Sequence, residues 1–174
     1  MSSFLEILLM VVSTPHFYIA VLGPALVALV LWWGSATVRQ ELEDFLPAIC
    51  FATVSNTLIA MLQILVINSR FDSLSLHLFS FILIPVFLRC YYNVQVPSPA
   101  TVYIASWVSI FAPDVFGAFL FSLYSLHPTV SGDWLTYVGG GGWFDTLFLA
   151  PPLSALVAFA ARAAQRSSSL IKSL

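Results

Sequence analysis

Long apolar stretches separated by short polar segments run through the whole chain, and they constrain its fold more than any motif does. Hydrophobic residues make up 60% of the sequence and charged residues only 8%, with a mean hydropathy of +0.96. A water-soluble domain carries roughly a quarter charged residues, because its surface must be hydrated. About 20 apolar residues in a helix span a bilayer core. We therefore predict an all-α integral membrane protein, with residues 1–174 forming a single membrane domain.

The polar segments divide the chain into about five predicted transmembrane helices in a compact bundle. These spans cover about 17–33, 46–67, 74–88, 101–123 and 144–164. A short interfacial helix over about 4–12 is predicted before them, since this stretch reaches only about 14 Å and the core is roughly 30 Å thick. Ser98-Pro99 is typical of a helix N-cap followed by proline. The polar stretch 35–44 is predicted to be a connecting loop or a turn of exposed helix, and 165–174 a frayed serine-rich tail.

The basic residues indicate the orientation of these spans. With the amino terminus outside, the predicted cytoplasmic segments hold Arg39, Arg89, Arg162, Arg166 and Lys172, and the outside holds only Arg70. Lys and Arg concentrate in cytoplasmic segments of membrane proteins. We therefore expect a multi-pass protein of the inner or plasma membrane with its amino terminus outside and its carboxyl terminus in the cytoplasm.

Four of the predicted spans contain proline, and these positions have two interpretations. Pro113, for example, removes one helical hydrogen bond and leaves the carbonyl of Ser109 without its donor. In lipid such a carbonyl needs another partner or a water-lined cavity. Transporters use broken helices of this kind around a site, but proline is also common in membrane helices that are merely kinked.

Asp114 is the most informative single residue. It lies 13 residues into the fourth predicted span, about 20 Å from the cytoplasmic face. An aspartate at such a depth costs roughly 2.5 to 3.5 kcal/mol to insert, so it should face the interior of the bundle. It is either a carboxylate that carries a proton or a cation or contacts a substrate, or a neutral or hydrogen-bonded residue that fixes helix packing through Asn56 or Gln63.

Several further polar residues share the outer half of the predicted membrane. Gln63, His77 and Asp145 project there, and Asn56 lies near the midplane on the same helix face as Gln63. Together with Asp114 they suggest an outward-facing polar pocket that serves as a ligand site or proton pathway. Amides also join membrane helices as ordinary packing contacts, which is the alternative for each one.

Four consecutive glycines, Gly139, Gly140, Gly141 and Gly142, precede the fifth predicted span. Their backbone can take positive φ and present N–H groups to an anion near a helix N-terminus. The alternative is a flexible extracytoplasmic loop, with Asp145 in the first helical turn interacting with the helix dipole.

Three functions are compatible with these features. The first is a non-catalytic binding partner, either an immunity or exclusion-type protein or an accessory subunit of a membrane complex. The second is a transporter of small solutes or ions, or its substrate-binding subunit, with its pocket around Asp114. The third is an intramembrane aspartyl-type hydrolase, although Trp143 and Phe144 separate the glycines from Asp145, where known motifs place the acid directly after glycine.

We expect the first of these functions, with no catalytic residue and no cofactor. No set of His, Cys and carboxylate residues has the spacing of a zinc or iron site, so no metal is expected. The partners are the lipid bilayer and another membrane protein or a second copy of the chain. Nucleic acid is excluded, since it would require clustered Lys and Arg.

Overall fold

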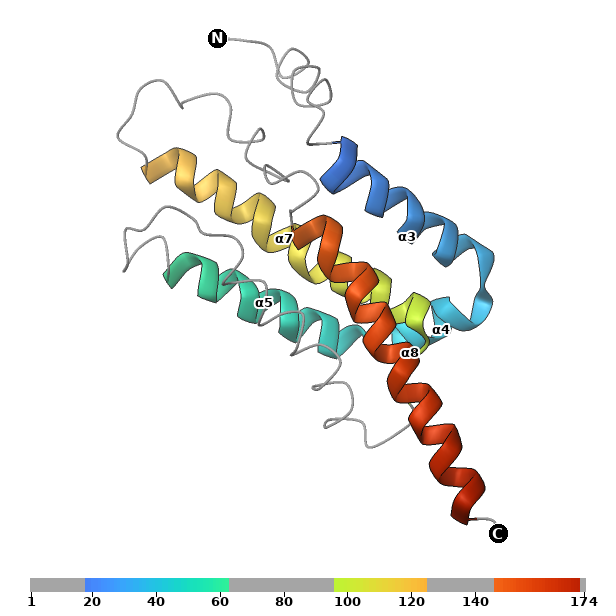
Figure 1. Cartoon of the computed structure of the whole chain (residues 1–174). Helices are drawn as coiled ribbons and strands as arrows, with labels where there is room; N and C mark the ends of the chain where they lie inside the picture. The colour runs from blue at the N-terminus through green and yellow to red at the C-terminus, as the bar shows by residue number, and fades with distance from the viewer. Residues whose placement is uncertain (1–17, 63–95, 125–145, 173–174) are drawn as a thin grey trace.

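The structure is a computed structural model that describes residues 18–62, 96–124 and 146–172, and these ranges are helical apart from Ser35, Phe45 and residues 96–98 (Figure 1). The elements are η1 (Tyr18–Leu22), α3 (Gly23–Gly34), α4 (Ala36–Asp44), α5 (Leu46–Leu62), α7 (Pro99–Tyr124) and α8 (Thr146–Lys172). The prediction of a helical bundle is thus confirmed for this part of the chain. The predicted interfacial helix over 4–12 and the predicted span over 74–88 lie outside the described residues.

The polar stretch 35–44 forms a helix of its own, α4, which leaves α3 at an angle of 105°. Ser35 has extended backbone, and its hydroxyl accepts a hydrogen bond from the amide of Val38 at 3.3 Å, which caps the start of α4. The Arg39 guanidinium donates to the carbonyls of Trp32 and Trp33, at 3.2 and 3.4 Å. These bonds satisfy the last carbonyls of α3 and hold the bend.

Helix α7 lies at the centre of the described bundle and packs against α5, α8 and α3. In Figure 1, α5 and α7 both run away from α4, whereas α3 and α8 run towards it. The start of α7, the second half of α8 and all of α4 therefore meet at one end of the molecule. Helix α8 continues beyond this end to Lys172, where the sequence predicts a frayed tail.

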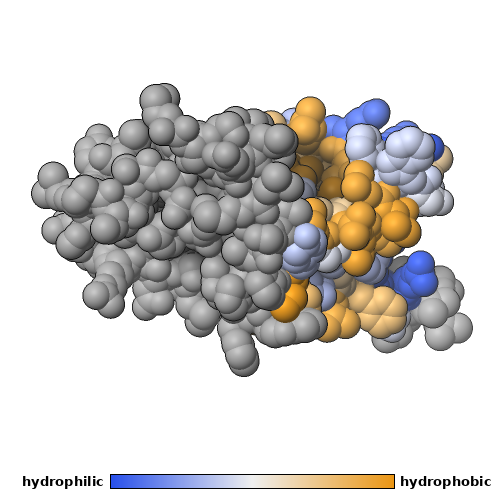
Figure 2. Space-filling view, turned by 90° about the horizontal axis from the view of Figure 1, so that it is seen from above, coloured by the Kyte–Doolittle hydropathy of each residue, from blue (hydrophilic) through white to orange (hydrophobic). Residues whose placement is uncertain are grey.

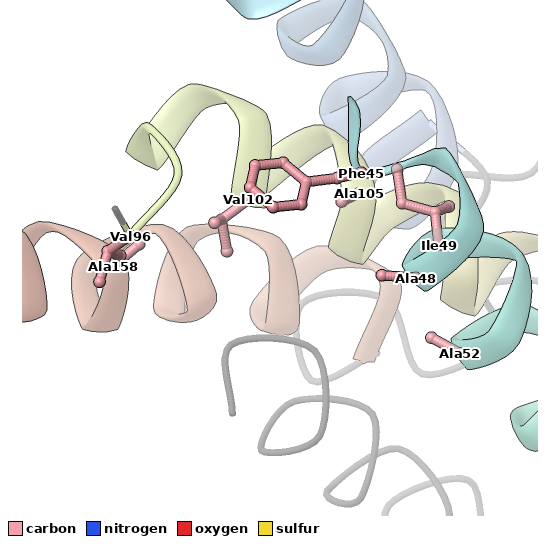
Figure 3. Close-up of a cluster of buried hydrophobic side chains, with 8 residues drawn as sticks. All are labelled: Phe45, Ala48, Ile49, Ala52, Val96, Val102, Ala105 and Ala158. Carbon is pink, nitrogen blue, oxygen red and sulfur yellow. The ribbon is translucent and has the colours of Figure 1, made fainter. Parts of the chain in front are cut away.

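A cluster of buried hydrophobic side chains joins these elements near the same end (Figure 3). Its members are Phe45, Ala48, Ile49, Ala52, Val96, Val102, Ala105 and Ala158. Half of them are alanines, which let helix backbones approach closely. Phe45, at the corner between α4 and α5, fills the space beside Val102 and Ala105 on α7.

The outward faces of the helices are strongly apolar. Trp33 is 79% exposed and Val30 70% on α3, and Phe159 is 65% exposed on α8. Figure 2 shows a band of hydrophobic residues on the described surface, with hydrophilic residues gathered beyond it at one end. By length and composition, Leu147–Ser167 of α8 is able to cross a membrane, and Tyr18–Gly34 passes the same test only together with α4.

Candidate functional site

Buried polar groups form two clusters in the described part of the chain. The end cluster lies where α4, α7 and α8 meet and consists of Glu41, Val96, Ser98, Thr101, Arg162 and Gln165. The mid-bundle cluster lies between α5, α7 and α8 and consists of Asn56, Ser106, Ser109 and Ser154. The first contains charges and the second does not.

Glu41 is the centre of the end cluster. One carboxylate oxygen, Oε2, accepts hydrogen bonds from the amide of Ser98 at 2.8 Å and from the hydroxyl of Thr101 at 2.5 Å. The Ser98 hydroxyl also accepts from the amide of Thr101 at 3.2 Å, so the predicted N-cap of the helix that starts at Pro99 is confirmed. The carboxylate of α4 thus sits at the N-terminus of α7, where the helix dipole favours a negative charge.

Arg162 connects α8 to both of the other elements. Its Nη2 donates to Oε1 of Glu41 at 3.1 Å, and its Nε donates to the carbonyl of Val96 at 2.6 Å. The side-chain carbonyl of Gln165 accepts from the amide of Val96 at 3.2 Å. Both polar groups of Val96, which precedes α7, are therefore bound by α8.

The ion pair of the end cluster is largely removed from solvent, since the Glu41 side chain is 19% exposed and that of Arg162 30%. Burial by itself raises the pKa of the Glu41 carboxyl, but the hydrogen bonds from Ser98 and Thr101 and the charge of Arg162 outweigh it. The pKa of Glu41 therefore lies below its ordinary value of 4.5. Glu41 is ionised at neutral pH, so the end cluster holds a true ion pair.

An open cleft adjoins the end cluster on the inner side of the bend between α3 and α4. Its volume is about 640 Å³. The residues that line it include Leu31 of α3, Val38 of α4, Ala100 and Tyr103 of α7 and Ala155 of α8, with the Glu41–Arg162 pair at its polar end. The cleft is therefore apolar along most of its wall, with one ion pair at one end.

Asn56 holds the mid-bundle cluster together. It is 1% exposed, and its side-chain Nδ2 donates to the carbonyl of Ser109 at 3.1 Å. This is the carbonyl that Pro113 deprives of its helical donor, so an amide of α5 replaces the missing bond. The hydroxyls of Ser106 and Ser154 lie 3.2 Å apart and join α7 to α8.

Asp114 follows Pro113 directly on α7 and is only 6% exposed. It lies 15 residues from the start of α7 at Pro99, about 22 Å along the helix. So far from the polar end the outer surface of the helices is apolar. The Asp114 carboxyl group is therefore accommodated in the interior of the bundle. Among the described residues no group of three His, Cys, Asp or Glu side chains is arranged to hold a metal ion.

Two of the predicted site residues fall in the described ranges, and both are buried: Asn56 on α5 and Asp114 on α7. The others lie outside the described residues, namely Gln63, His77, Asp145 and residues 139–142. The outward-facing pocket therefore stays a prediction.

The end cluster is absent from the sequence-based prediction of the site. Arg162 lies near the end of the fifth predicted span, and a charge within an apolar helix requires a partner. This need for a partner was the signal in the sequence that pointed to the end cluster. The partner, Glu41, is 121 residues away, however, and no spacing rule identifies a contact over such a distance.

Comparison of the chain with protein-family models, with curated proteins and with solved structures gave no match. Only the residues of this chain therefore bear on its function.

Proposed function

We propose that the protein is a multi-pass inner-membrane protein that acts as a non-catalytic binding partner, either of immunity or exclusion type or as an accessory subunit of a membrane complex. The observation that supports this proposal is where the polar and the apolar side chains lie. In the described helices the buried side chains of Asn56, Ser106 and Ser154 bond to neighbouring helices, and large apolar side chains face outward.

The apolar outward faces support insertion in a bilayer. A soluble monomer rarely exposes contiguous apolar patches of more than a few hundred Å², and here exposed Leu, Val, Phe and Trp side chains occur on α3, α5 and α8. Arg39, Arg162 and Arg166 all lie towards the end at which hydrophilic residues gather. By the preference of basic residues for the cytoplasm, that end is the cytoplasmic one and the amino terminus lies outside.

The mid-bundle cluster supports a packed scaffold. The Asn56 amide and the Ser106 and Ser154 hydroxyls make bonds between helices. Such bonds contribute about 0.6 kcal/mol each in membrane bundles, and they fix helix packing. What the bundle then offers to another protein is its outward surface, which includes the exposed face of α8 with Leu156 and Phe159.

Two experiments test the membrane location and the orientation. Membranes from cells expressing the full chain are extracted with alkaline carbonate, and a reporter fused after Leu174 is assayed on each side. An integral protein with a cytoplasmic reporter is expected, and release by carbonate or an external reporter would contradict the membrane location or the orientation, respectively.

The binding role is tested by photocrosslinking in intact membranes. A benzophenone side chain is placed at Leu156, which is 63% exposed on α8, and at the buried Ile110 as the control. One discrete protein adduct, or a dimer of the chain, is expected from Leu156 and none from Ile110. Lipid adducts alone, together with a monomer in native detergent extracts, would overturn the binding role.

A second candidate function is a carrier of ions or small solutes, and the burial of Asp114 beside Pro113 favours it. It predicts proton-coupled uptake by the purified protein in liposomes. Asp114→Asn should abolish this uptake, whereas Asp44→Asn, at an exposed position of α4, should leave it intact. An Asp114→Asn protein with full uptake would exclude a proton-carrying role for this carboxyl group.

A further inference from the structure

We propose that the cleft at the bend between α3 and α4 binds the headgroup region of one membrane phospholipid, with the phosphodiester held by Arg162. The proposal rests on the membrane location proposed above and names a ligand that this location supplies.

The shape and lining of the cleft suit such a ligand. Its volume of about 640 Å³ falls in the range of roughly 300 to 1,000 Å³ that small-molecule sites occupy. Leu31, Val38, Ala100 and Ala155 are among the residues that line it, and most of its wall is apolar. An acyl chain or a glycerol backbone makes apolar contacts with this wall that water cannot make.

The polar end of the cleft holds a suitable donor for a phosphate. Arg162 uses Nε for Val96 and Nη2 for Glu41, and its Nη1 makes no hydrogen bond with the described residues. The hydroxyl of Ser35, which accepts from Val38, also lines the cleft and keeps its own proton to donate. A guanidinium already fixed by two bonds loses little freedom when it binds a phosphate oxygen.

The charge of the cleft distinguishes a phospholipid from a free anion. Glu41 is ionised and lies beside Arg162, so the two charges cancel and the cleft has no net attraction for inorganic phosphate. A phospholipid adds the burial of apolar surface to the bond with the guanidinium. The neutral pair also predicts that zwitterionic and anionic phospholipids bind with similar affinity.

The position of the cleft fits the same ligand. It lies next to the bend at Ser35, and its lining includes both apolar side chains such as Leu31 and the Glu41–Arg162 ion pair. In the proposed orientation this level is the cytoplasmic headgroup region, where phosphates of the inner leaflet lie.

The test uses the full chain, purified in detergent and stripped of lipid, and it follows thermal unfolding. A phospholipid such as dioleoyl-phosphatidylethanolamine or dioleoyl-phosphatidylglycerol, present at about 100 times its Kd, should raise the midpoint by about 5–10 °C. Dioleoylglycerol, which has the same chains without the phosphate, should raise the midpoint far less, and inorganic phosphate should leave it unchanged. An equal rise with either of these compounds, or no rise with phospholipid, would overturn the proposal.

Two matched variants of α8 test whether the phospholipid binds in the cleft. Ala155→Phe fills the cleft and should reduce the phospholipid retained through purification, measured by native mass spectrometry, at least about tenfold, which corresponds to about 1.4 kcal/mol. Ala163→Phe, at an exposed position two turns further along α8, should retain as much phospholipid as the parent. Equal retention by both variants would refute this location.

A measurement on the unaltered protein covers the case in which Ala155→Phe fails to fold. A phospholipid with a photoactivatable diazirine next to its headgroup is crosslinked to the parent chain, and the labelled peptides are mapped. Labelling of the α3–α4 bend and the first turn of α7 is expected, and labelling confined to other segments would overturn the proposal. A chain that is integral by carbonate extraction yet shows no cleft label refutes the lipid site alone, whereas a chain released by carbonate refutes the membrane location itself.

Discussion

The end cluster and the mid-bundle cluster both join helices through polar side chains, but they do so with different chemistry. The end cluster uses a carboxylate and a guanidinium, which retain 19% and 30% of their exposure and share bonds with backbone groups of Val96 and Ser98. The mid-bundle cluster uses an amide and hydroxyls that are 0 to 1% exposed. The more deeply buried cluster is the uncharged one, so the two chemistries differ with depth in the bundle.

The cost of removing charge from water explains the difference. A charge that is fully buried requires several strong bonds to offset its lost hydration, whereas a neutral amide or hydroxyl requires only one or two. Glu41 accepts three hydrogen bonds and lies at the N-terminus of α7. Asn56 needs only the carbonyl that Pro113 leaves open. The two clusters should therefore respond differently to substitution.

Arg162→Met should have the largest effect. It keeps an apolar side chain on α8 but leaves the Glu41 carboxylate without its counter-charge and the Val96 carbonyl without its donor. We expect a loss of about 3 kcal/mol in the free energy of unfolding, measured by denaturant titration in detergent. Arg166→Met, one helical turn further on and exposed, is the control and should lose far less. Equal losses for the two variants would show that the ion pair does not stabilise the end of the bundle.

Acid should weaken the end cluster and spare the mid-bundle cluster. The pKa of Glu41 is lower in the folded protein than its ordinary value of 4.5, so its contribution to stability is present above pH 4.5 and is lost as the pH falls through the folded pKa. Unfolding free energies measured from pH 7 downward should decline in this window. In Glu41→Gln that part of the decline should disappear, while Asn56→Ala should follow the parent profile; an unchanged profile in Glu41→Gln would contradict this assignment.

Asn56→Ala should have an intermediate effect, because it leaves the Ser109 carbonyl buried without a donor. The expected loss is about 1.5 kcal/mol. Pro113→Ala restores a backbone N–H that can bond to Ser109, four residues earlier, so Asn56→Ala should cost only about 0.5 kcal/mol in that background. A double-mutant cycle measures this coupling. Full additivity would mean that Asn56 does not act by replacing the bond lost at Pro113.

The hydroxyl pair Ser106 and Ser154 should give the smallest effect. Ser106→Ala should lower the free energy of unfolding by about 0.6 kcal/mol, the average for such bonds between membrane helices. Replacing both serines with alanine should cost no more than replacing one, since no buried hydroxyl is then left without a partner. A double variant that loses twice as much as the single one would indicate that each serine has a separate role.

The sequence predicted the helical class, the N-cap at Ser98 and the need of the Ser109 carbonyl for a new donor. It pointed to Asn56 and Asp114 as buried polar residues without naming the bond that Asn56 makes. The bend at Ser35 was predicted only as a loop or a turn of helix, because it depends on a contact between two helices: Ser35 caps α4, and Arg39 of α4 bonds back to the last carbonyls of α3. The cleft and the end cluster were not predicted at all.

Hydropathy, proline positions and caps are properties of a residue and its near neighbours, so they can be read from the sequence, and they predicted the apolar helices that the structure describes. Which helices touch is decided by packing between distant segments. Only the tertiary structure therefore brought Glu41 to Arg162, 121 residues apart, and Asn56 to Ser109, 53 residues apart. The physical reason is that a buried polar group must find a partner, but the identity of that partner depends on which helix faces it.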